Sequence, residues 1–371
     1  MKVNGKSYRT IWIDPKSGVL TVINQNKLPH RFETSELHSV SDVCNAIKNM
    51  VVRGAGLIGA TAGFGMWIAA KTAPCDNLAD FEKWLFHSAE LLKKTRPTAV
   101  DLQWAVKRQL KEIEKGINLK EKIQIALDTA SVICEASILS GKKIGEYGKK
   151  IIADISKKNP EKPVNILTHC NAGWLAFVDY GSALAPVYAA YDDGIPVHVW
   201  VDETRPRNQG ASLTAWELSM HGVPHTLIVD NAGGHIMQHG MVDMVITGAD
   251  RITRRGDVAN KIGTYLKAVA ASDNNIPFYV AAPSSSFDFN LTDGIEGIPI
   301  EERDADEVRF IAGETLDGVI ETVRICLPET AARNWAFDVT PARLITKLIC
   351  EHGICNASDT DISELFLGSK Q

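Results

Sequence analysis

Two clusters of small and polar residues in the second half of the chain carry side chains suited to acid–base or nucleophilic chemistry. Cys170 lies in the cluster at residues 168–173, Asp250 lies in the cluster at residues 248–251, and each cluster follows an apolar run. In an open α/β sheet, ligands bind outside the carboxyl ends of the strands. A thiol and a carboxylic acid at two such ends are therefore expected to share one crevice, which indicates an enzyme.

Five apolar runs in this half end in the same way. They cover residues 164–167, 197–201, 226–229, 242–246 and 278–281, and the small or polar clusters that follow them begin at Thr168, Asp202, Asp230, Thr247 and Ala282. Five such ends along one sheet edge are better explained by a ligand site than by the chemistry of turns alone.

Cys170 lies beside Asn171 and Gly173, a loop-like setting in which backbone amides or a helix N-terminus favour the thiolate. A purely structural role is the competing interpretation for any single cysteine. The adjacent His169 is interpreted as structural rather than as a base, because neighbouring side chains diverge. No Gly-x-Ser-x-Gly sequence is present, which weakens acyl transfer as the chemistry.

Asp250 follows a buried-looking run and two small residues, so we expect its carboxylate to be partly shielded from water. Desolvation raises the pKa of a carboxyl group towards the range where it exchanges protons near neutrality. An ion pair with Arg251, or a cap on a following helix, is the alternative. Asp202 and Asp230 have the same two interpretations.

Residues 257–265 are typical of a helix start, with Asp257 or Gly256 at the cap and Asn260 and Lys261 in the first turn, where an anion would be favoured. Guanidinium groups pair bidentately with phosphate, so arginines are further candidates. These are Arg53, Arg96, Arg205 and Arg207. The chemistry predicts a substrate with an acidic group, and no metal is expected. No dinucleotide is expected either, because no Gly-x-Gly-x-x-Gly sequence follows a strand.

The elements that position these residues change in kind along the chain. Residues 7–13 and 19–23 predict a β hairpin, and residues 41–115 have helical apolar spacing. The small residues of 53–65 allow either close helix packing or close approach of backbone amides to a ligand. After residue 163, strands alternate with helix-compatible stretches, which predicts a mainly parallel, Rossmann-like sheet.

The predicted fold is therefore an α/β protein: a smaller, mainly helical domain with an N-terminal hairpin at residues 1–145, then a Rossmann-like catalytic domain at 146–371. The boundary is placed in the charged segment 142–162, after a helix at 123–139. Further helices are expected at residues 175–192, 212–221, 235–240, 258–272 and 341–352. Residues 356–371 either pack on a partner or fray.

Composition restricts the function classes. The chain has 371 residues, 45% hydrophobic and 23% charged, which suits a globular protein of about two domains. A net charge of −5 argues against nucleic-acid binding. Seven cysteines without a Cys-x-x-Cys pair predict a reducing compartment and no zinc site, with Cys44, Cys134, Cys326 and Cys350 as core residues. Without a long apolar run or signal peptide, a cytoplasmic protein with no membrane partner is expected.

Several longer motifs resemble the methylthioribose-1-phosphate isomerase family, a branch of the group that also holds regulatory subunits of the eukaryotic translation-initiation exchange factor. The resemblance covers most of the chain. The matching motifs are residues 53–55, 96–100, 168–171, 202–207, 209–210, 213–216, 248–252, 256–265, 300–303 and 336–341.

The resemblance implies an aldose–ketose isomerase of methionine salvage that opens a furanose 1-phosphate and moves the carbonyl from C1 to C2, without a cofactor. It implies Asp250 as the proton donor and Cys170 as the residue that stabilises the transition state. It also implies a homodimer. The implied substrate-binding positions are Arg53, Gly54, Ala55, Arg96, Gln209, Asn260 and Lys261.

The resemblance leaves the group at C5 of the sugar open. The family pattern after Arg-Gly-Ala is usually Pro-Ala-Ile-Gly, whereas this chain has Gly56, Leu57, Ile58 and Gly59. Residues 101–104 also differ from the usual Asn-Leu-Phe-Trp. We expect a looser loop and a larger side chain, Leu57, close to the sugar. The alternatives are a 5-deoxyribose 1-phosphate isomerase, then a ribose 1,5-bisphosphate isomerase, then a non-enzymatic regulatory subunit.

Overall fold

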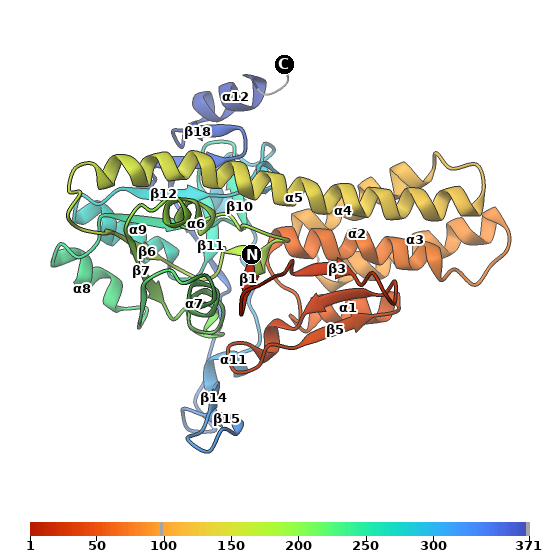
Figure 1. Cartoon of the computed structure of the whole chain (residues 1–371), viewed down its shortest axis with the longest axis horizontal. Coiled ribbons are helices and arrows are strands. Elements are labelled where there is room, and N and C mark those ends of the chain that lie inside the picture. Colours follow the sequence, from red (N-terminus) through yellow and green to blue (C-terminus); the bar gives the residue numbers. More distant parts are fainter. Residues whose placement is uncertain (97–98, 369–371) are drawn as a thin grey trace. The chain divides into compact units, whose positions relative to one another are not determined.

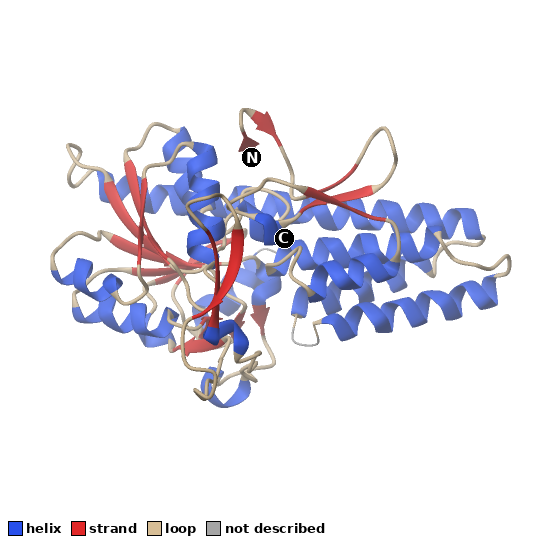
Figure 2. Cartoon of the chain, turned by 90° about the horizontal axis from the view of Figure 1, so that it is seen from below, coloured by secondary structure: helices blue, strands red, loops and turns tan. Residues whose placement is uncertain are grey.

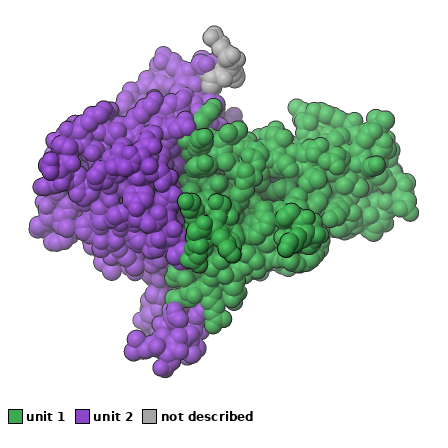
Figure 3. All heavy atoms as spheres, in the orientation of Figure 1, with its two compact units in different colours: residues 1–143, 172–184 green, residues 144–171, 185–371 purple. Residues whose placement is uncertain are grey.

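The computed structural model describes residues 1–96 and 99–368, and the chain forms two compact units (Figure 3). Unit 1 contains Met1–Lys143 and Ala172–Leu184, whereas unit 2 contains Ile144–Asn171 and Ala185–Gln371. The first division falls between Lys143 and Ile144, within one helix. Whether residues 1–145 and 146–371 fold as separate domains stays a prediction.

The N-terminal part of unit 1 is built from short antiparallel strands. β1 (Lys2–Val3) pairs with β2 (Lys6–Ser7), and β3 (Ile11–Ile13), β4 (Leu20–Ile23) and β5 (Thr34–Leu37) form a three-stranded sheet. The turn between β3 and β4 is fixed by the Asp14 carboxylate, which accepts hydrogen bonds from the backbone N–H groups of Lys16 and Ser17 at 3.0 and 2.8 Å. The predicted hairpin is confirmed, with one further strand.

The rest of unit 1 is helical, as its apolar spacing predicts. Its helices are α1 (Val40–Lys48), α2 (Ala55–Lys71), α3 (Leu78–Thr95), α4 (Val100–Ile113) and the first part of α5 (Leu119–Ser156). Every residue of α2 from Leu57 to Ala70 is buried, because this apolar helix packs against α1, α3 and α4 on several sides. The hydrophobic core of unit 1 therefore surrounds α2.

Helix α5 is longer than the sequence predicts. It has 38 residues and continues through the charged segment in which the helix was expected to have ended (Figure 1). Among the described residues it is the one helix long and apolar enough to cross a membrane. Ala130 and Ile133 nevertheless pack in the core of unit 1, and Ile144 and Ile152 are fully buried in unit 2. The helix therefore contributes buried side chains to both units.

Unit 2 is built on a seven-stranded sheet with helices on both faces (Figure 2). Its order is β18-β17-β12-β9-β6-β7-β8, and all neighbours are parallel except β18 at the edge. The strands are β6 (Val164–Thr168), β7 (Val197–Asp202), β8 (His225–Ile228), β9 (Met244–Thr247), β12 (Phe278–Ala281), β17 (Lys347–Cys350) and β18 (Gly353–Cys355). The predicted α/β fold with a parallel sheet is confirmed.

The helices of unit 2 are α6 (Ala185–Asp192), α7 (Ala215–His221), α8 (Ala232–Gln238), α9 (Thr264–Asp273), α12 (Asp359–Gly368) and the short α10 (Gly294–Gly297) and α11 (Asp306–Arg309). A second sheet has the order β13-β10-β11-β16. Its strands are β10 (Arg251–Thr253), β11 (Val258–Lys261), β13 (Phe287–Asp288) and β16 (Phe337–Thr340), and β14 (Phe310–Glu314) with β15 (Ile320–Arg324) forms a separate hairpin.

Three predicted helices are wrong in whole or in part. Residues 258–261 form β11, and residues 341–352 form a short 3₁₀ turn, Ala342–Leu344, followed by β17. The stretch 175–192 is helical only in α6, after a 3₁₀ turn at Trp174–Ala176. In each case a short apolar run fits a helix and a buried strand or loop equally well.

The C-terminal tail packs within unit 2 as far as it is described. Ile362 in α12 is fully buried, and the ring of Phe366 lies 5.0 Å from that of Phe287 and 4.9 Å from that of Phe289, measured between centroids. Residues 369–371, the end of the tail for which fraying was considered, lie outside the described part of the chain.

Candidate active site

Cys170 follows β6 and has a backbone conformation that is unusual for a non-glycine residue, with φ of +65°. Its N–H donates to Thr204 Oγ1 at 2.8 Å, and its carbonyl accepts from Thr214 Oγ1 at 2.7 Å. The next residue, Asn171, donates from Nδ2 to Thr214 Oγ1 at 3.1 Å and to the buried carboxylate of Glu217. Hydrogen bonds therefore hold both peptide groups of a half-buried cysteine.

The loop after β7 that supplies Thr204 is itself tied to the end of β8. The Asp230 carboxylate accepts from the backbone N–H groups of Thr204 and Arg205, each at 2.8 Å. Thr204 also has a positive φ, +65°. Gly210 packs so closely on this loop that a Cβ atom there would overlap the Asp202 carbonyl oxygen, which fixes glycine at that position. The ends of β6, β7 and β8 thus form one hydrogen-bonded unit.

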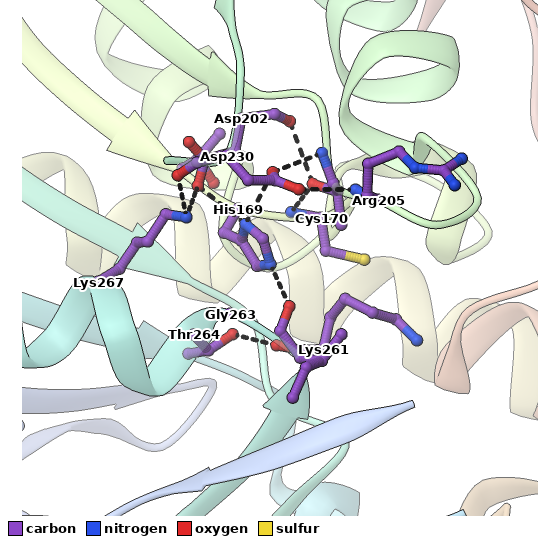
Figure 4. Close-up of polar contacts among 12 residues, drawn as sticks. His169, Cys170, Asp202, Arg205, Asp230, Lys261, Gly263, Thr264 and Lys267 are labelled. Atoms are coloured by element: carbon purple, nitrogen blue, oxygen red, sulfur yellow. Dashed lines mark hydrogen bonds and ion pairs between the residues drawn. The ribbon is translucent and has the colours of Figure 1, made fainter. Parts of the chain in front are cut away.

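His169 lies behind Cys170, with its ring almost fully buried (Figure 4). Nδ1 is 2.8 Å from Asp202 Oδ2, and Nε2 is 2.8 Å from the carbonyl oxygen of Ile262. Lys267 Nζ lies 3.1 Å from the same oxygen of Asp202. Both ring nitrogens are engaged by the protein, which agrees with the interpretation of His169 as structural rather than as a base.

His169, Asp202 and Asp230 offer ligand atoms that all lie within 4.8 Å of one another, as in a metal site. The cation found there is the ammonium of Lys267, which contacts Asp202 Oδ2 and donates to the carbonyl oxygen of Asp230. A buried ammonium already balances the carboxylates, and it would repel a metal ion. The cluster therefore functions as a buried ion-pair network.

Asp250 follows β9, the strand next to β6 in the sheet, so the acid and the thiol belong to neighbouring strand ends. Its N–H donates to the carbonyl oxygen of Ala259 in β11 at 2.9 Å. The side chain is exposed, so the expected shielding of the carboxylate is wrong. Arg251 lies 3.6 Å from Asp288, which gives this arginine a carboxylate partner of its own.

Asn260 and Lys261 lie on β11 rather than in the first turn of a helix. Asn260 is buried and donates from Nδ2 to Thr264 Oγ1 at 3.0 Å. Lys261 Nζ lies 4.6 Å from the ring centroid of Phe337 on β16, a cation–π contact. Helix α9 begins after Gly263, which has a φ of +103°. The predicted helix start is therefore wrong by several residues.

Asp257, the predicted cap of that helix, has a different role. Its carboxylate accepts from the backbone N–H of Gly294 and from that of Ala342, each at 3.0 Å. Gln209 is buried directly before the helical turn Gly210–Thr214. Arg205 and Arg207, considered as phosphate ligands, are used within unit 2: Arg205 donates to the Val308 carbonyl, and Arg207 pairs with Glu307.

Arg53, Gly54, Ala55 and Arg96 belong to unit 1. Gly54 precedes α2 with a φ of +90°, and a Cβ atom there would lie 2.4 Å from the carbonyl oxygen of Ala176. Only glycine fits at this position, which supports tight packing as the interpretation of this part of the small-residue stretch. Close approach of backbone amides to a ligand stays a prediction. Ala55 begins α2, and Arg96 ends α3. Residues 97–98 of the Arg96 motif lie outside the described residues.

The departures from the family pattern also lie in unit 1. Leu57 is fully buried in the core, so the expectation that it brings a larger side chain close to the sugar is wrong. Gly56 faces the ring of Phe177, and a Cβ atom there would lie 2.4 Å from Phe177 Cδ1. The glycine therefore makes room for a buried phenylalanine of the segment Ala172–Leu184.

The thiols differ in chemical environment. Burial raises the pKa of Cys134 and of Cys350 to about 12 and that of Cys355 to about 11. Cys44 and Cys326 are only half-buried, so neither is the fully buried core residue that the sequence predicts, although Cys44 packs against the core of unit 1. Thr204 and Thr214, which bond the backbone of Cys170, lie in the motifs 202–207 and 213–216 but were not singled out there. Lys267, which contacts Asp202, was missed, because nothing in the sequence marks it.

The sheet with a thiol and an acid at neighbouring strand ends defines an α/β enzyme of the Rossmann-like class. The chain matches the model of the "Initiation factor 2 subunit family" over residues 51–357. It is 54% identical to the methylthioribose-1-phosphate isomerases of Desulfatibacillum aliphaticivorans and Brucella anthropi, over 99% of this chain and 99% of each relative. The chain therefore belongs to the initiation factor 2 subunit family, in the branch of the methylthioribose-1-phosphate isomerases.

Two solved structures have the same fold. The 5-methylthioribose 1-phosphate isomerase of Pyrococcus horikoshii aligns with a TM-score of 0.84 at 40% identity, covering 98% of this chain and 96% of that one. A structure described as translation initiation factor eIF-2B, subunit delta, from A. fulgidus aligns with a TM-score of 0.82 at 37% identity, covering 97% of this chain and all of that one. The expected family and fold are confirmed.

Proposed function

We propose that this chain is an isomerase that converts 5-methylthioribose 1-phosphate into 5-methylthioribulose 1-phosphate. The observation that carries the proposal is 54% identity to isomerases of that name over 99% of the chain. Cys170 and Asp250, at the ends of the neighbouring strands β6 and β9, supply a thiol and an acid for the reaction. A non-enzymatic regulatory subunit would have no need of this pair.

The substrate sets the chemical problem. Because C1 carries a phosphate, the ring cannot open to a free aldehyde, so ring-oxygen protonation and hydrogen transfer from C2 to C1 must both occur in the site. We assign the first step to Asp250, whose exposed carboxyl group can be reprotonated from water. Cys170 acts at the C1–C2 edge by proton transfer or by stabilising developing charge, and its clamped backbone suits a group of fixed position.

The phosphate and hydroxyl groups need cationic and amide ligands. We assign this role to the positions at which the chain resembles the isomerase family, namely Arg53, Gly54, Ala55, Arg96, Gln209, Asn260 and Lys261. Lys261 supplies an ammonium held over an aromatic ring, and Gly54 directly precedes α2, whose N-terminus suits an anion. No cofactor has a part in this scheme.

The assay is turnover of the purified chain with three sugars: 5-methylthioribose 1-phosphate, 5-deoxyribose 1-phosphate and ribose 1,5-bisphosphate. We expect the methylthio sugar to have the highest kcat/KM. Cys170→Ser and Asp250→Asn should each lower kcat at least 100-fold, whereas the matched control Cys75→Ser, at another half-buried cysteine, should leave it unchanged. Preference for the bisphosphate, turnover of no sugar, or full activity of Asp250→Asn would overturn the proposal.

Solvent deuterium separates the two routes of hydrogen transfer. If Cys170 carries a proton between C2 and C1, the ketose formed in D₂O should contain deuterium at C1, measured by NMR or mass spectrometry. A product without deuterium would exclude a proton shuttle in exchange with water and leave hydride transfer, with Cys170 stabilising charge.

We also propose that the protein acts as a homodimer in the cytoplasm. Among the described residues, the β14–β15 hairpin and the chain after it expose apolar side chains that a second copy would cover, including Leu316, Val323, Ile325 and Leu327. All seven cysteines are free thiols, as a reducing compartment favours. Light scattering of the purified chain should give twice the monomer mass, and a monomer would contradict the assembly.

A further inference from the structure

The hydrogen bonds of His169 determine its protonation. Nε2 faces a carbonyl oxygen, that of Ile262, which can only accept, so Nε2 carries a proton. Nδ1 faces Asp202 Oδ2, an oxygen that also lies 3.1 Å from the ammonium of Lys267. An oxygen that already contacts an ammonium is suited to accept a second hydrogen bond, so Nδ1 is also placed to donate. The two acceptors therefore favour a ring of His169 that donates from both nitrogens.

The surrounding charges agree with a cationic ring. Three carboxylates lie around His169 and Lys267. Asp202 contacts both His169 and Lys267, Asp230 Oδ1 lies 3.9 Å from Nδ1 of the ring, and the Asp338 carboxylate accepts from the backbone N–H groups of Gly263 and Tyr265. The two cations thus balance most of the negative charge of this buried cluster, and a neutral histidine would leave it unbalanced.

The ring joins the two segments that carry the proposed catalytic thiol and a proposed substrate ligand. His169 directly precedes Cys170, and Ile262, which accepts from the ring, directly follows Lys261. Gly263 approaches the ring so closely that a Cβ atom there would lie 3.0 Å from Nε2. In Figure 4 the Cys170 sulfur and the Lys261 ammonium extend to the same side of the cluster. Any shift of the ring would change the distance between these two segments.

We propose that His169 is a positioning residue. Its doubly protonated ring, held by Asp202 and Ile262, keeps the loop that contains Cys170 at a fixed distance from the turn that directly follows Lys261. This inference rests on the proposed isomerase function for its kinetic consequence only. The strained backbone of Cys170 makes such support necessary, because the loop would relax if one of its hydrogen-bonded neighbours moved.

The test compares His169→Gln with the control His198→Gln, a histidine on β7 whose Nε2 lies 3.0 Å from Thr226 Oγ1. We expect His169→Gln to lower kcat about 100-fold and change KM less than about threefold, as misplacement of a reacting group by about 1 Å does. The control should keep wild-type values. Thermal unfolding of each variant checks that it folds.

Two further measurements need no substrate, so they remain decisive if no sugar phosphate is turned over. Iodoacetamide should alkylate Cys170 at least fivefold more slowly in His169→Gln, because the nearby positive charge and the fixed loop are lost. Nitrogen-15 NMR of the wild-type chain at pH 7 should show both ring nitrogens of His169 protonated, and Asp202→Asn should give a neutral ring. A neutral wild-type ring, or alkylation and kcat unchanged by His169→Gln, would overturn the proposal.

Discussion

Cys170 has a backbone conformation that an L residue adopts only when its surroundings hold it there. Its φ of +65° lies in the left-handed region, which costs a non-glycine residue roughly 1–2 kcal/mol. The hydroxyl groups of Thr204 and Thr214 compensate by bonding the two peptide groups. These hydrogen bonds therefore offset the cost of the left-handed backbone at Cys170.

Glycine at position 170 separates backbone strain from the chemistry of the thiol. We expect Cys170→Gly to be more stable than Cys170→Ala by about 1 kcal/mol, because glycine has no Cβ to oppose a positive φ. Neither variant should isomerise substrate. Urea unfolding of the two variants measures the difference, and an alanine variant that is equally stable or more stable would show that the backbone is not strained.

The sequence predicts single residues best where a reactive side chain closely follows an apolar run. Cys170 and Asp250 were placed at strand ends because each follows an apolar run, and the structure has both strands. The contacts of Thr214 and Lys267 could not be predicted, because the sequence around a hydroxyl or an ammonium group in a helical stretch does not identify its partner. Their partners are 44 and 37 residues away in the sequence.

At the scale of elements, runs of apolar residues predicted the five parallel strands but not the second sheet. β11 pairs with β16, nearly eighty residues later, so neither strand can be recognised from its own sequence. Asn260 and Lys261 consequently appeared to begin a helix. β17 was also missed, because its buried run Leu348–Cys350 is too short to distinguish a central strand from a helix.

The base of the β14–β15 hairpin is held by an ion-pair cluster around Glu307. Burial alone would raise the pKa of this carboxyl group, but hydrogen bonds and charge from Arg303, with hydrogen bonds from Arg207 and Asn334, lower it from 4.5 to about 2. Because the pKa in the folded protein is the lower one, the cluster stabilises the fold above pH 4.5. This stabilisation is lost as the pH falls from 4.5 towards 2.

Glu307→Gln should therefore lower the free energy of unfolding by roughly 1–3 kcal/mol at pH 7, because it removes one of the two carboxylates that pair with Arg303 and the carboxylate that pairs with Arg207. The difference between the variant and the wild type should shrink as the pH is lowered from 4.5. Urea unfolding at pH 7, 4 and 3 measures this, with Glu302→Gln at an exposed ion pair as the control. A difference that is independent of pH would contradict the assignment.

At the scale of the whole molecule, the chain enters unit 1 twice. The segment Ala172–Leu184 returns to it directly after the Cys170 loop, and no sequence pattern could predict this. Its contacts within unit 1 reach far back along the chain: Thr10 Oγ1 donates to the Phe177 carbonyl, and Gln25 Nε2 donates to that of Leu175. Residues so distant in sequence carry no common local signal.

A chain ending at Lys143 should fail to form a stable unit 1. Without the segment Ala172–Leu184, Gln25 loses a buried acceptor and the surface around Gly54 loses Ala176. We expect such a fragment to unfold without a cooperative transition in circular dichroism on heating. Linking residues 172–184 to it through a short glycine-rich connection should restore cooperativity. A fragment 1–143 that melts cooperatively by itself would contradict this expectation.

The order in which a ribosome releases the chain gives this return a consequence for biosynthesis. When residue 143 has emerged, unit 1 still lacks thirteen of its residues, Ala172–Leu184, and the first stretch of unit 2, Ile144–Asn171, must be made before they appear. Neither unit can be completed before the other has begun. The nascent chain therefore spends longer with exposed apolar surface than one that finishes its units in turn, and its dependence on chaperones should be correspondingly greater.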